Sequence, residues 1–405
     1  MTSTIVSLIS ILVFCITISK GRKTLNTTHE LSTSSLITNI NGICKTMVET
    51  QGYTCEEHKV TTEDGYILSL QRISARQSDK KADKPPVLIQ HGIFCDARIW
   101  LFNSPEESLG FILADNGVDV WLVNGRGTKY STMHTSLTPD DMAYWDWSWD
   151  ELANYDLPAS VQYVYNHTGK KIHYASHSQG TLMAFVNLSQ GKLLNMLRSA
   201  ALLSPIAYMN PNPSKEISLV VGLFLTNEVY WSSLYQFIPN VDVITKFVNE
   251  ICNTLNLDLT NLLTLFTGPN CCLNSSRMDV YLDHVPQPTS TKNLIHFSQM
   301  TRTGKITKYD YVHQAQNLLH YGHRTPPTYD LTKIPTEFPL FLGVGGQDML
   351  SDVQDVNLLL NDLKDHDSNK LVVSLNDNYA HLDFIAAINA KQLIYDPMIA
   401  FFNAH

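Results

Sequence analysis

The chain has 405 residues, of which 44% are apolar and 17% are charged, a balance typical of a globular protein and not of a disordered one. Its net charge of -9 and isoelectric point near 5.9 argue against nucleic acid as a ligand, although they identify no substrate. Large α/β folds often reach about 250 residues as one unit, so the length favours a single core that carries an insertion.

The chain begins with a mostly apolar run, from Ile5 to Ile18, which is followed by three basic residues. This run is too short for a comfortable membrane span, so it predicts a signal peptide over residues 1–20, with a retained signal anchor as the alternative. Asn-x-Ser/Thr sequons are consistent with a glycoprotein of the secretory pathway, and four of them occur, at Asn26, Asn166, Asn187 and Asn274.

Six cysteines follow the predicted signal peptide, and an even count in a secreted chain indicates disulfide bonds. The favoured pairs are Cys44 with Cys55, and Cys252 with Cys271 or Cys272. Cys95 is expected to stay reduced. The chain has no C-x-x-C or histidine-spaced pair, so no zinc site or other metal centre is expected.

Short apolar runs alternate with helical patterns along most of the chain. This alternation predicts a mostly parallel sheet covered by helices on both sides. One helix is expected to begin at Asp156-Leu157-Pro158, where a capping residue precedes an early proline. The expected strands are 87–90, 118–123, 172–175, 200–203, 338–344 and 371–375.

The first expected strand runs into His91-Gly92-Ile93, and a glycine there lets the backbone approach a bound acyl carbonyl. Farther on, Arg126 lies between two glycines and is interpreted as an ion-pair or turn residue. Three alternating tryptophans are interpreted as core side chains and not as a ligand site: Trp145, Trp147 and Trp149.

The pentapeptide 176–180, SHSQG, lies between an apolar run and a helical pattern. Strand, sharp turn and helix are the context of a nucleophile elbow, in which the central serine is lifted clear of the sheet and the positions two before and two after it are small, here Ser176 and Gly180. Ser178 is therefore the candidate nucleophile. Its backbone neighbour Gln179 and Ile93 are the candidate oxyanion-hole donors, through their N–H groups.

More than a hundred residues separate the strand that ends near Ser204 from the one that begins near Phe338, far more than a loop requires. We expect an inserted cap here. Its apolar run 217–225 is about half the length needed to cross a bilayer; it either covers an acyl site and meets lipid, or forms a helix buried within the cap.

The acid and the base are expected late in the chain. Asp348 follows an apolar strand that breaks at Gly345-Gly346, and His381 follows the next strand and a polar loop. Together with Ser178 they stand in the order nucleophile, acid, histidine that an α/β-hydrolase uses. The competing residues are Asp352, Asp355 and Asp383 for the acid, and His366 and His405 for the base.

These motifs resemble those of the acid lipase family of α/β-hydrolases, which includes gastric and lysosomal acid lipases and the plant triacylglycerol lipases. The similarity covers nearly the whole mature chain and runs through YTCEEH at 53–58, QHG at 90–92, NGRG at 124–127, WSWDE at 147–151, HSQGT at 177–181, GGQD at 345–348 and HLDF at 381–384. The family usually has glycine where this chain has Ser176. The resemblance implies Ser178, Asp348 and His381 as the catalytic triad, and Ile93 and Gln179 as oxyanion donors.

The sequence thus predicts an α/β-hydrolase fold, with a mostly parallel central sheet and an inserted helical cap. The expected division is 1–20 signal peptide, 21–204 first part of the core, 205–335 cap and 336–405 second part of the core. The expected protein is a secreted, lysosome-like or vacuolar serine esterase that cleaves lipid esters, acylglycerols first, at a lipid–water interface, without cofactor, metal, nucleic acid or membrane span. The alternatives are action on a non-glyceride ester, acyl transfer, and an inactive hydrolase fold used for binding.

Overall fold

The computed structural model describes residues 42–76, 82–209, 236, 237, 264 and 267–405. The predicted signal peptide 1–20, the sequon at Asn26, the apolar run 217–225 and Cys252 lie outside these residues. Within them, no helix combines the length and the apolar character that a membrane span needs.

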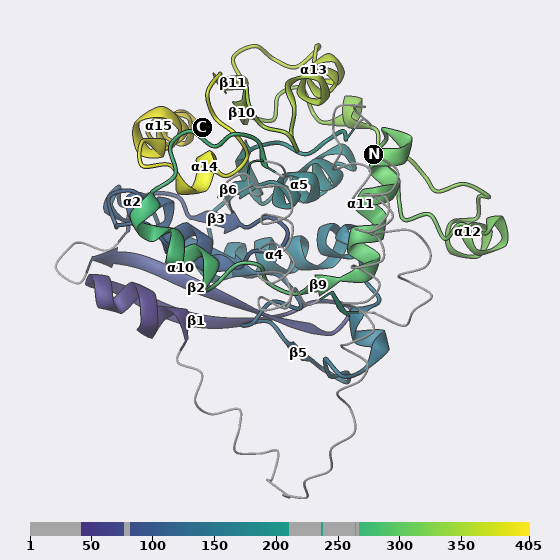
Figure 1. Ribbon diagram of the computed structural model, residues 1–405, viewed down its shortest axis with the longest axis horizontal. Coiled ribbons are helices and arrows are strands. Elements are labelled where there is room, and N and C mark those ends of the chain that lie inside the picture. The colour runs from purple at the N-terminus through teal and green to yellow at the C-terminus, as the bar shows by residue number, and fades with distance from the viewer. Residues whose placement is uncertain (1–41, 77–81, 210–235, 238–263, 265–266) are drawn as a thin grey trace, which may run out of the picture.

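Strands and helices alternate along the described chain (Figure 1). The strands are β1 (Tyr53–Thr61), β2 (Tyr66–Arg76), β3 (Val87–Gln90), β4 (Val120–Asn124), β5 (Met133–His134), β6 (Ile172–His177), β7 (Leu197–Leu203), β8 (Gln236–Phe237), β9 (Thr289–Ser290), β10 (Leu340–Gly345) and β11 (Leu371–Asn376). The α-helices are α2 (Leu109–Asp115), α3 (Trp149–Glu151), α4 (Leu157–Thr168), α5 (Gln179–Ser189), α10 (Met278–Leu282), α11 (Thr291–Thr303), α12 (Gln314–Tyr321), α13 (Val353–Asp362), α14 (Asp383–Ala386) and α15 (Asp396–Ala404).

The main sheet has the strand order β1-β2-β4-β3-β6-β7-β10-β11, with β5 paired to β2. From β4 to β11 all neighbours are parallel, and β1, β2 and β4 are joined by antiparallel pairs. Each of the six expected strands is present, and no end differs from the expected one by more than three residues. The predicted mostly parallel sheet of an α/β-hydrolase is therefore confirmed.

The antiparallel strands β1 and β2 were not among the expected strands. Their pattern explains this, because β1 is exposed or half-buried at seven of its nine residues and carries charged side chains. A central parallel strand such as β3, by contrast, is buried at every position and is visible as an apolar run.

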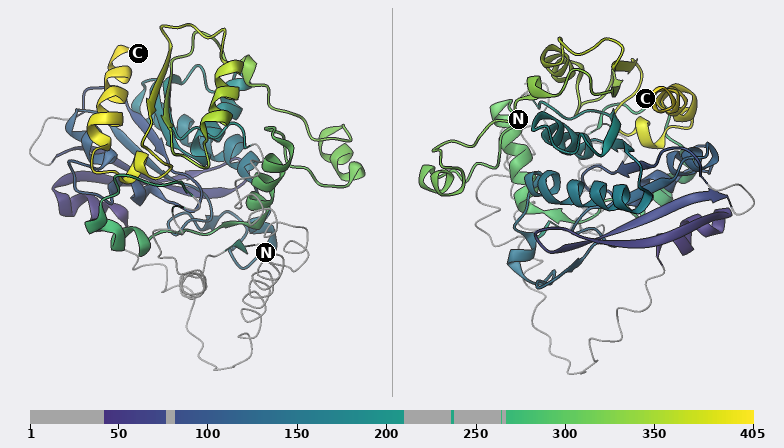
Figure 2. Two further views of the ribbon diagram at one scale, coloured as in Figure 1. Left: turned by 45° about the horizontal axis from the view of Figure 1, so that its top comes forward. Right: turned by 180° about the vertical axis from the view of Figure 1, so that it is seen from behind.

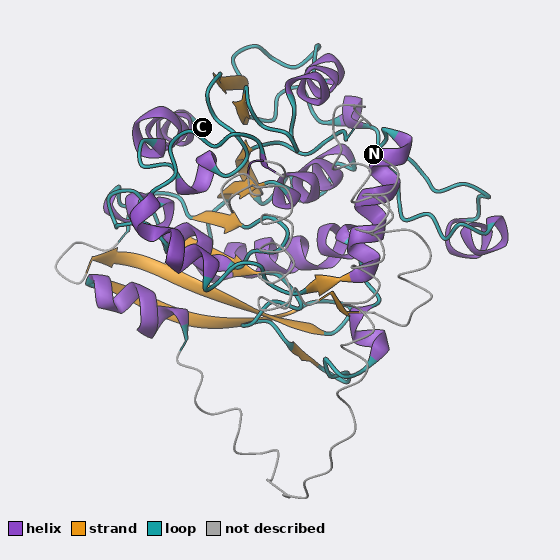
Figure 3. Ribbon diagram, viewed as in Figure 1, coloured by secondary structure: helices purple, strands orange, loops and turns teal. Residues whose placement is uncertain are grey.

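Helices cover both faces of the sheet, as Figures 2 and 3 show. One hydrophobic core joins the sheet to α3, α4 and α5 through side chains such as Trp149, Val161 and Leu182. The other joins it to α2 and α15, through Phe111 and Phe402. The three tryptophans of 145–149 are at most 3% exposed, which confirms their assignment to the core.

Helix α4 begins at Leu157, as predicted, but Asp156 is not its N-terminal cap. The chain is already helical before it, because a π-helical turn over Leu152–Asp156 continues from α3. The buried Asp156 carboxylate instead binds Arg126, whose Nε donates to it at 2.7 Å. The other end of the guanidinium binds Asp64, with Nη1 2.6 Å from Oδ2, so Arg126 is the structural ion-pair residue that was predicted.

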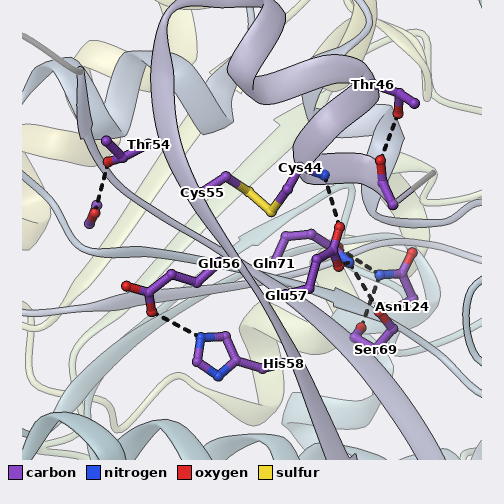
Figure 4. The surroundings of a disulfide bond; sticks show 12 residues. Cys44, Thr46, Thr54, Cys55, Glu56, Glu57, His58, Ser69, Gln71 and Asn124 are labelled. Atoms are coloured by element: carbon purple, nitrogen blue, oxygen red, sulfur yellow. Dashed lines mark hydrogen bonds and ion pairs between the residues drawn. A yellow bond between two sulfur atoms is a disulfide. The ribbon is translucent and has the colours of Figure 1, made fainter.

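The predicted disulfide between Cys44 and Cys55 is present and joins the turn before β1 to that strand (Figure 4). Beside it, the Cys44 N–H donates to Glu57 at 2.9 Å, and Gln71 donates to the other oxygen of Glu57 at 2.6 Å. Cys95 is free and buried, as expected.

The second predicted pairing is not seen, because Cys271 is bonded to its neighbour Cys272. A bond between adjacent cysteines closes no loop between distant residues, whereas the predicted pairing with Cys252 would close one. One sequon also needs correction as a glycosylation site: Asn187 is 1% exposed, and its amide donates to Ala153 and Met183 within the core. Asn166, on α4, is exposed.

The segment between β7 and β10 contains the expected cap, 205–335, whose limits remain a prediction. Its described part includes β9, α10, α11 and α12. Helix α11 is joined to the core by His296, which stacks on Trp149 with ring centroids 3.9 Å apart. The same imidazole contacts the Ser148 hydroxyl at 3.1 Å and the Thr307 carbonyl at 2.9 Å.

Candidate active site

Ser178 is the single residue between β6 and α5, and its backbone has the unusual angles φ 55° and ψ -122°. A positive φ is rare for a residue with a side chain and is held only where neighbouring contacts impose it. Here the Ser178 N–H donates to Leu203 at 3.1 Å, and its carbonyl accepts from the Thr181 N–H at 2.8 Å and the Thr181 hydroxyl at 2.6 Å. The strand, the strained serine and the helix form the predicted elbow.

The elbow is tightly packed, which explains its small residues. A Cβ added to Gly180 would lie 2.9 Å from the Cβ of Ser176 and 3.0 Å from Cγ of Gln90. Ser176 itself is fully buried, and its hydroxyl has no hydrogen-bond partner among the described residues. The strand therefore accommodates a serine at position 176 because residue 180 has no side chain.

Asp348 and His381, predicted from separate loops, lie in direct contact. The loop after β10 carries Asp348 and the loop after β11 carries His381, and the imidazole Nδ1 is 2.9 Å from Oδ2 and 3.1 Å from Oδ1 of the carboxylate. Both side chains are buried. A carboxylate at Nδ1 keeps the proton on that nitrogen and leaves Nε2 as the basic atom.

The environment of Asp348 favours its ionised form. Burial alone would raise the pKa of this carboxyl, but His381 and two backbone donors outweigh burial and hold the pKa below its usual value. The donors are the N–H groups of Leu350 and Ser351, each 2.9 Å from Oδ1.

The competing acids and bases have structural partners. Asp352 caps α13 by accepting from the Asp355 N–H at 2.8 Å. Asp383 accepts from the backbone of Cys271, Cys272 and Ala380. His366 bonds the Phe338 carbonyl at 2.8 Å, so it lies at the opposite end of β10 from Asp348.

A contact that we did not predict joins the elbow to the candidate base. His177, the residue before Ser178, contacts the carbonyl of His381 through Nε2 at 2.8 Å, and the two ring centroids are 4.6 Å apart. The Ser204 hydroxyl reaches the same carbonyl at 3.5 Å. His177 thus holds the loop of His381 beside Ser178. The partners are 204 residues apart, so nothing in the local pattern around position 177 indicates the contact.

The candidate oxyanion donors lie on the loop after β3 and at the start of α5. A Cβ on Gly92 would lie 2.9 Å from the Ser178 Cβ, so this glycine lets the loop after β3 approach the candidate nucleophile. Gln179 is the first residue of α5, where a backbone N–H has no partner within the helix. Ile93 and Gln179 line one small cavity of about 20 Å³ together with Gly92.

The segment expected to form the cap contacts the elbow through α11. The Asn293 amide on α11 donates to the Gln179 side-chain oxygen at 2.8 Å and to the Thr289 hydroxyl at 3.1 Å. The bond from Asn293 fixes the side chain of Gln179. The backbone N–H of Gln179 is oriented separately, by the first turn of α5. Helix α11 thus begins at the elbow.

Two clusters of possible metal ligands occur among the described residues, and neither contains the proposed triad. Cys271 and Cys272, beside Asp383, are joined in a disulfide and offer no thiolate. The other cluster, Glu56 with His58 and His167, is on β1 and α4, where the Arg72 guanidinium already lies 3.2 Å from the Glu56 carboxylate.

Comparison with known proteins relates most of the chain to lipases. Residues 44–104 match the family model described as a partial alpha/beta-hydrolase lipase region. Triacylglycerol lipase 2 of Arabidopsis thaliana is 43% identical over 365 residues, which cover 89% of this chain and 87% of that protein. Gastric triacylglycerol lipase of Rattus norvegicus is 38% identical over 87% of this chain and 90% of its own length.

Solved structures agree on the fold. A structure described as a lipase in its open form superposes with a TM-score of 0.54 at 14% identity, covering 87% of this chain and 99% of that one. A soluble variant of monoglyceride lipase from Saccharomyces cerevisiae gives a TM-score of 0.52, also at 14% identity, over 87% of this chain and 95% of that one.

Proposed function

Because the chain belongs to the α/β-hydrolase lipase family, whose members match it at 36–43% identity over most of its length, we propose that it hydrolyses acyl esters of lipids, acylglycerols first among them. The observation that carries the proposal is the pairing of Asp348 with His381 beside a strained serine elbow. This arrangement suits attack on an ester carbonyl.

In the proposed reaction, His381 Nε2 takes the proton of the Ser178 hydroxyl as Oγ attacks the acyl carbonyl. Asp348 keeps the imidazole in the required tautomer and stabilises the imidazolium that forms. The imidazolium then gives its proton to the departing alcohol oxygen, which leaves an acyl-enzyme at Ser178. Water, activated by the same imidazole, releases the fatty acid and restores the hydroxyl.

The N–H groups of Ile93 and Gln179 are proposed to stabilise the negative charge that develops on the carbonyl oxygen. Their support is the approach of Gly92 to Ser178 and the position of Gln179 at the start of α5. Loss of one such donor costs about 2.7–4 kcal/mol of transition-state stabilisation in other enzymes.

The proposal extends to the compartment. The apolar run from Ile5 to Ile18 and the Cys44–Cys55 disulfide are both consistent with the secretory pathway, where disulfides form and persist. The mature chain is proposed to be secreted or delivered to a lysosome-like or vacuolar compartment. Amino-terminal sequencing of the chain purified from a eukaryotic host would test this proposal, because cleavage is expected near residues 19–21.

The function is tested by incubating the purified mature chain with emulsified triacylglycerols, monoacylglycerols and a short soluble ester, while the released acid is titrated. Hydrolysis of the glycerides by the wild type, and its loss in Ser178→Ala, would support the proposal. Hydrolysis of only the soluble ester would shift the substrate class to non-glyceride esters. No hydrolysis of any ester would contradict it.

A further inference from the structure

A structured arm projects from the body of the protein after α11 (Figure 1), and it stands clear of the sheet in both other views (Figure 2). We define the α12 arm as residues 310–324. Its base is closed by backbone pairs, in which Lys308 donates to Pro327 at 2.8 Å and Tyr329 donates to Ile306 at 2.9 Å. Thr307 and Thr328 form a bridge between them.

The arm is held together by its own side chains. Asn317, only 2% exposed, accepts from the Tyr311 N–H at 3.0 Å and donates to Asp310 at 2.8 Å and to the Arg324 carbonyl at 3.2 Å. The rings of Tyr311 and His320 stack with centroids 3.8 Å apart. The arm therefore has a defined shape although it makes few contacts with the core.

This ordered arm directs aliphatic side chains into solvent. Leu319 is 77% exposed, Leu318 is 51% exposed and Val312 is 56% exposed. Val312 also has a φ of 66°, which a β-branched residue adopts only under constraint. Single exposed leucines are ordinary, but three such side chains within eight residues of a rigid projection suggest a surface that meets another apolar phase.

The charge around the arm differs from that of the whole protein. Residues 302–324 contain four Arg or Lys side chains and one Asp, a net charge of +3 by subtraction, within a chain of net charge -9. Arg324 lies in the arm, and the other three cations, Arg302, Lys305 and Lys308, lie in the segment that leads into it. Exposed leucines on a projection with basic residues at its base suit an anionic lipid surface. An apolar surface without charge would not use the cations, and a contact with a second copy of this acidic chain is an outcome that the test below distinguishes.

We propose that the α12 arm is an interfacial anchor that inserts Leu318 and Leu319 into a negatively charged lipid surface. The inference rests on the proposed lipase function and adds a site of attachment to it. Helix α11, whose Asn293 contacts Gln179, joins the arm to the elbow. Anchoring would thus hold the active site at the surface where its substrate lies.

The test uses the purified mature chain and flotation with vesicles of phosphatidylcholine, either alone or mixed with phosphatidylglycerol. The double variant Leu318→Gln/Leu319→Gln is expected to bind the mixed vesicles about tenfold more weakly, because two leucines no longer leave water. Leu319→Gln alone should give a smaller loss. Leu358→Gln, on α13 and 44% exposed, is the matched control and should bind like the wild type.

Charge is tested with Arg324→Gln, which should weaken binding to the mixed vesicles and leave the weaker binding to phosphatidylcholine unchanged. Equal binding by the double variant and the wild type would overturn the proposal. A change of oligomeric state by size exclusion, without a change in vesicle binding, would assign the leucines to a protein contact and would also overturn it.

Failure of this proposal can be told apart from failure of the proposed function. Vesicle binding is measured without turnover, and hydrolysis of a short soluble ester should be the same in wild type and double variant. Arm-dependent binding by a chain that hydrolyses no ester would contradict the lipase function alone. Normal lipase activity with arm-independent binding would contradict the anchor alone.

Discussion

The imidazole of His177 bonds the backbone carbonyl of His381 through Nε2, at 2.8 Å. Burial, together with the nearby His381, lowers the pKa of His177 to about 3, so this ring is neutral near neutral pH. The bond fixes the backbone of the proposed base relative to the residue that precedes the proposed nucleophile. His177 is thus a positioning residue.

Replacing His177 with Phe keeps an aromatic ring but removes this bond. The loop of His381 would then be free to shift, and we expect kcat to fall about tenfold with little change in KM, since a hydrogen bond contributes about 0.5–1.5 kcal/mol. Steady-state kinetics on a soluble ester measure kcat and KM separately. His173→Phe, at the other end of β6 and also buried, is the control; an equal kcat loss there would indicate a general packing effect.

A pH dependence of stability is expected from Asp150, a buried carboxylate that accepts from the Tyr329 hydroxyl at 2.7 Å and the Tyr309 N–H at 2.9 Å. Burial raises its pKa from 3.8 to about 6, so the folded state binds this proton more tightly than the unfolded state. Its contribution to stability is therefore greatest below about pH 3.8 and is lost as the pH rises to about 6.

The variant Asp150→Asn cannot ionise, so its free energy of unfolding should lack this dependence. Between about pH 3.8 and about pH 6, the free energy of unfolding of the variant is expected to rise by about 3 kcal/mol relative to that of the wild type. Denaturant unfolding at each pH measures it. The exposed Asp365, changed to Asn, serves as the control, and a parallel pH dependence in wild type and Asp150→Asn would contradict the prediction.

The Ser176 position can be tested with glycine, the residue usual in the family. Ser176→Gly should leave turnover unchanged or raise it several-fold, because the serine Cβ packs against Gly180 and its hydroxyl has no partner among the described residues. Stability should fall by about 0.5–1 kcal/mol from the added freedom of the unfolded chain. A large loss of activity in a folded variant would instead give the Ser176 hydroxyl a role in the reaction.

The Cys44–Cys55 bond should support stability without affecting chemistry. The bond closes a loop between residues 11 positions apart, at the end of the sheet separated from β6 by β2, β4 and β3. The double variant Cys44→Ala/Cys55→Ala is expected to lose about 2–3 kcal/mol of unfolding free energy, measured by denaturant titration. A loss of kcat at a temperature where the variant stays folded would show that β1 influences the site.

The parts of the fold that were predicted from sequence are those whose signal is local. Buried parallel strands such as β3 and β6 appear as mostly apolar runs, and small residues two positions before and two after Ser178 indicate the elbow. The exposed strand β1 has no such pattern. Contacts between distant residues were missed for the same reason: His177 with His381, and Asn293 with Gln179, depend on how the chain folds back and not on spacing.

Local signals also misled where burial changed a residue's partner. Asp156 has the sequence context of a helix cap, yet it neutralises the buried Arg126. Asn187 has the pattern of a sequon, yet its amide completes hydrogen bonds inside the core. In both cases a buried polar group must find a partner within the protein, and that requirement outweighs the local preference.

An acyl-enzyme at Ser178 is tested most directly by covalent labelling with a fluorophosphonate followed by peptide mass spectrometry. We expect one modified residue, Ser178, loss of hydrolysis in proportion to labelling, and no labelling of Ser178→Ala, whose turnover should fall by about 10⁴–10⁶-fold. Labelling at another residue, or a folded Ser178→Ala that keeps more than a few per cent of wild-type hydrolysis, would contradict it.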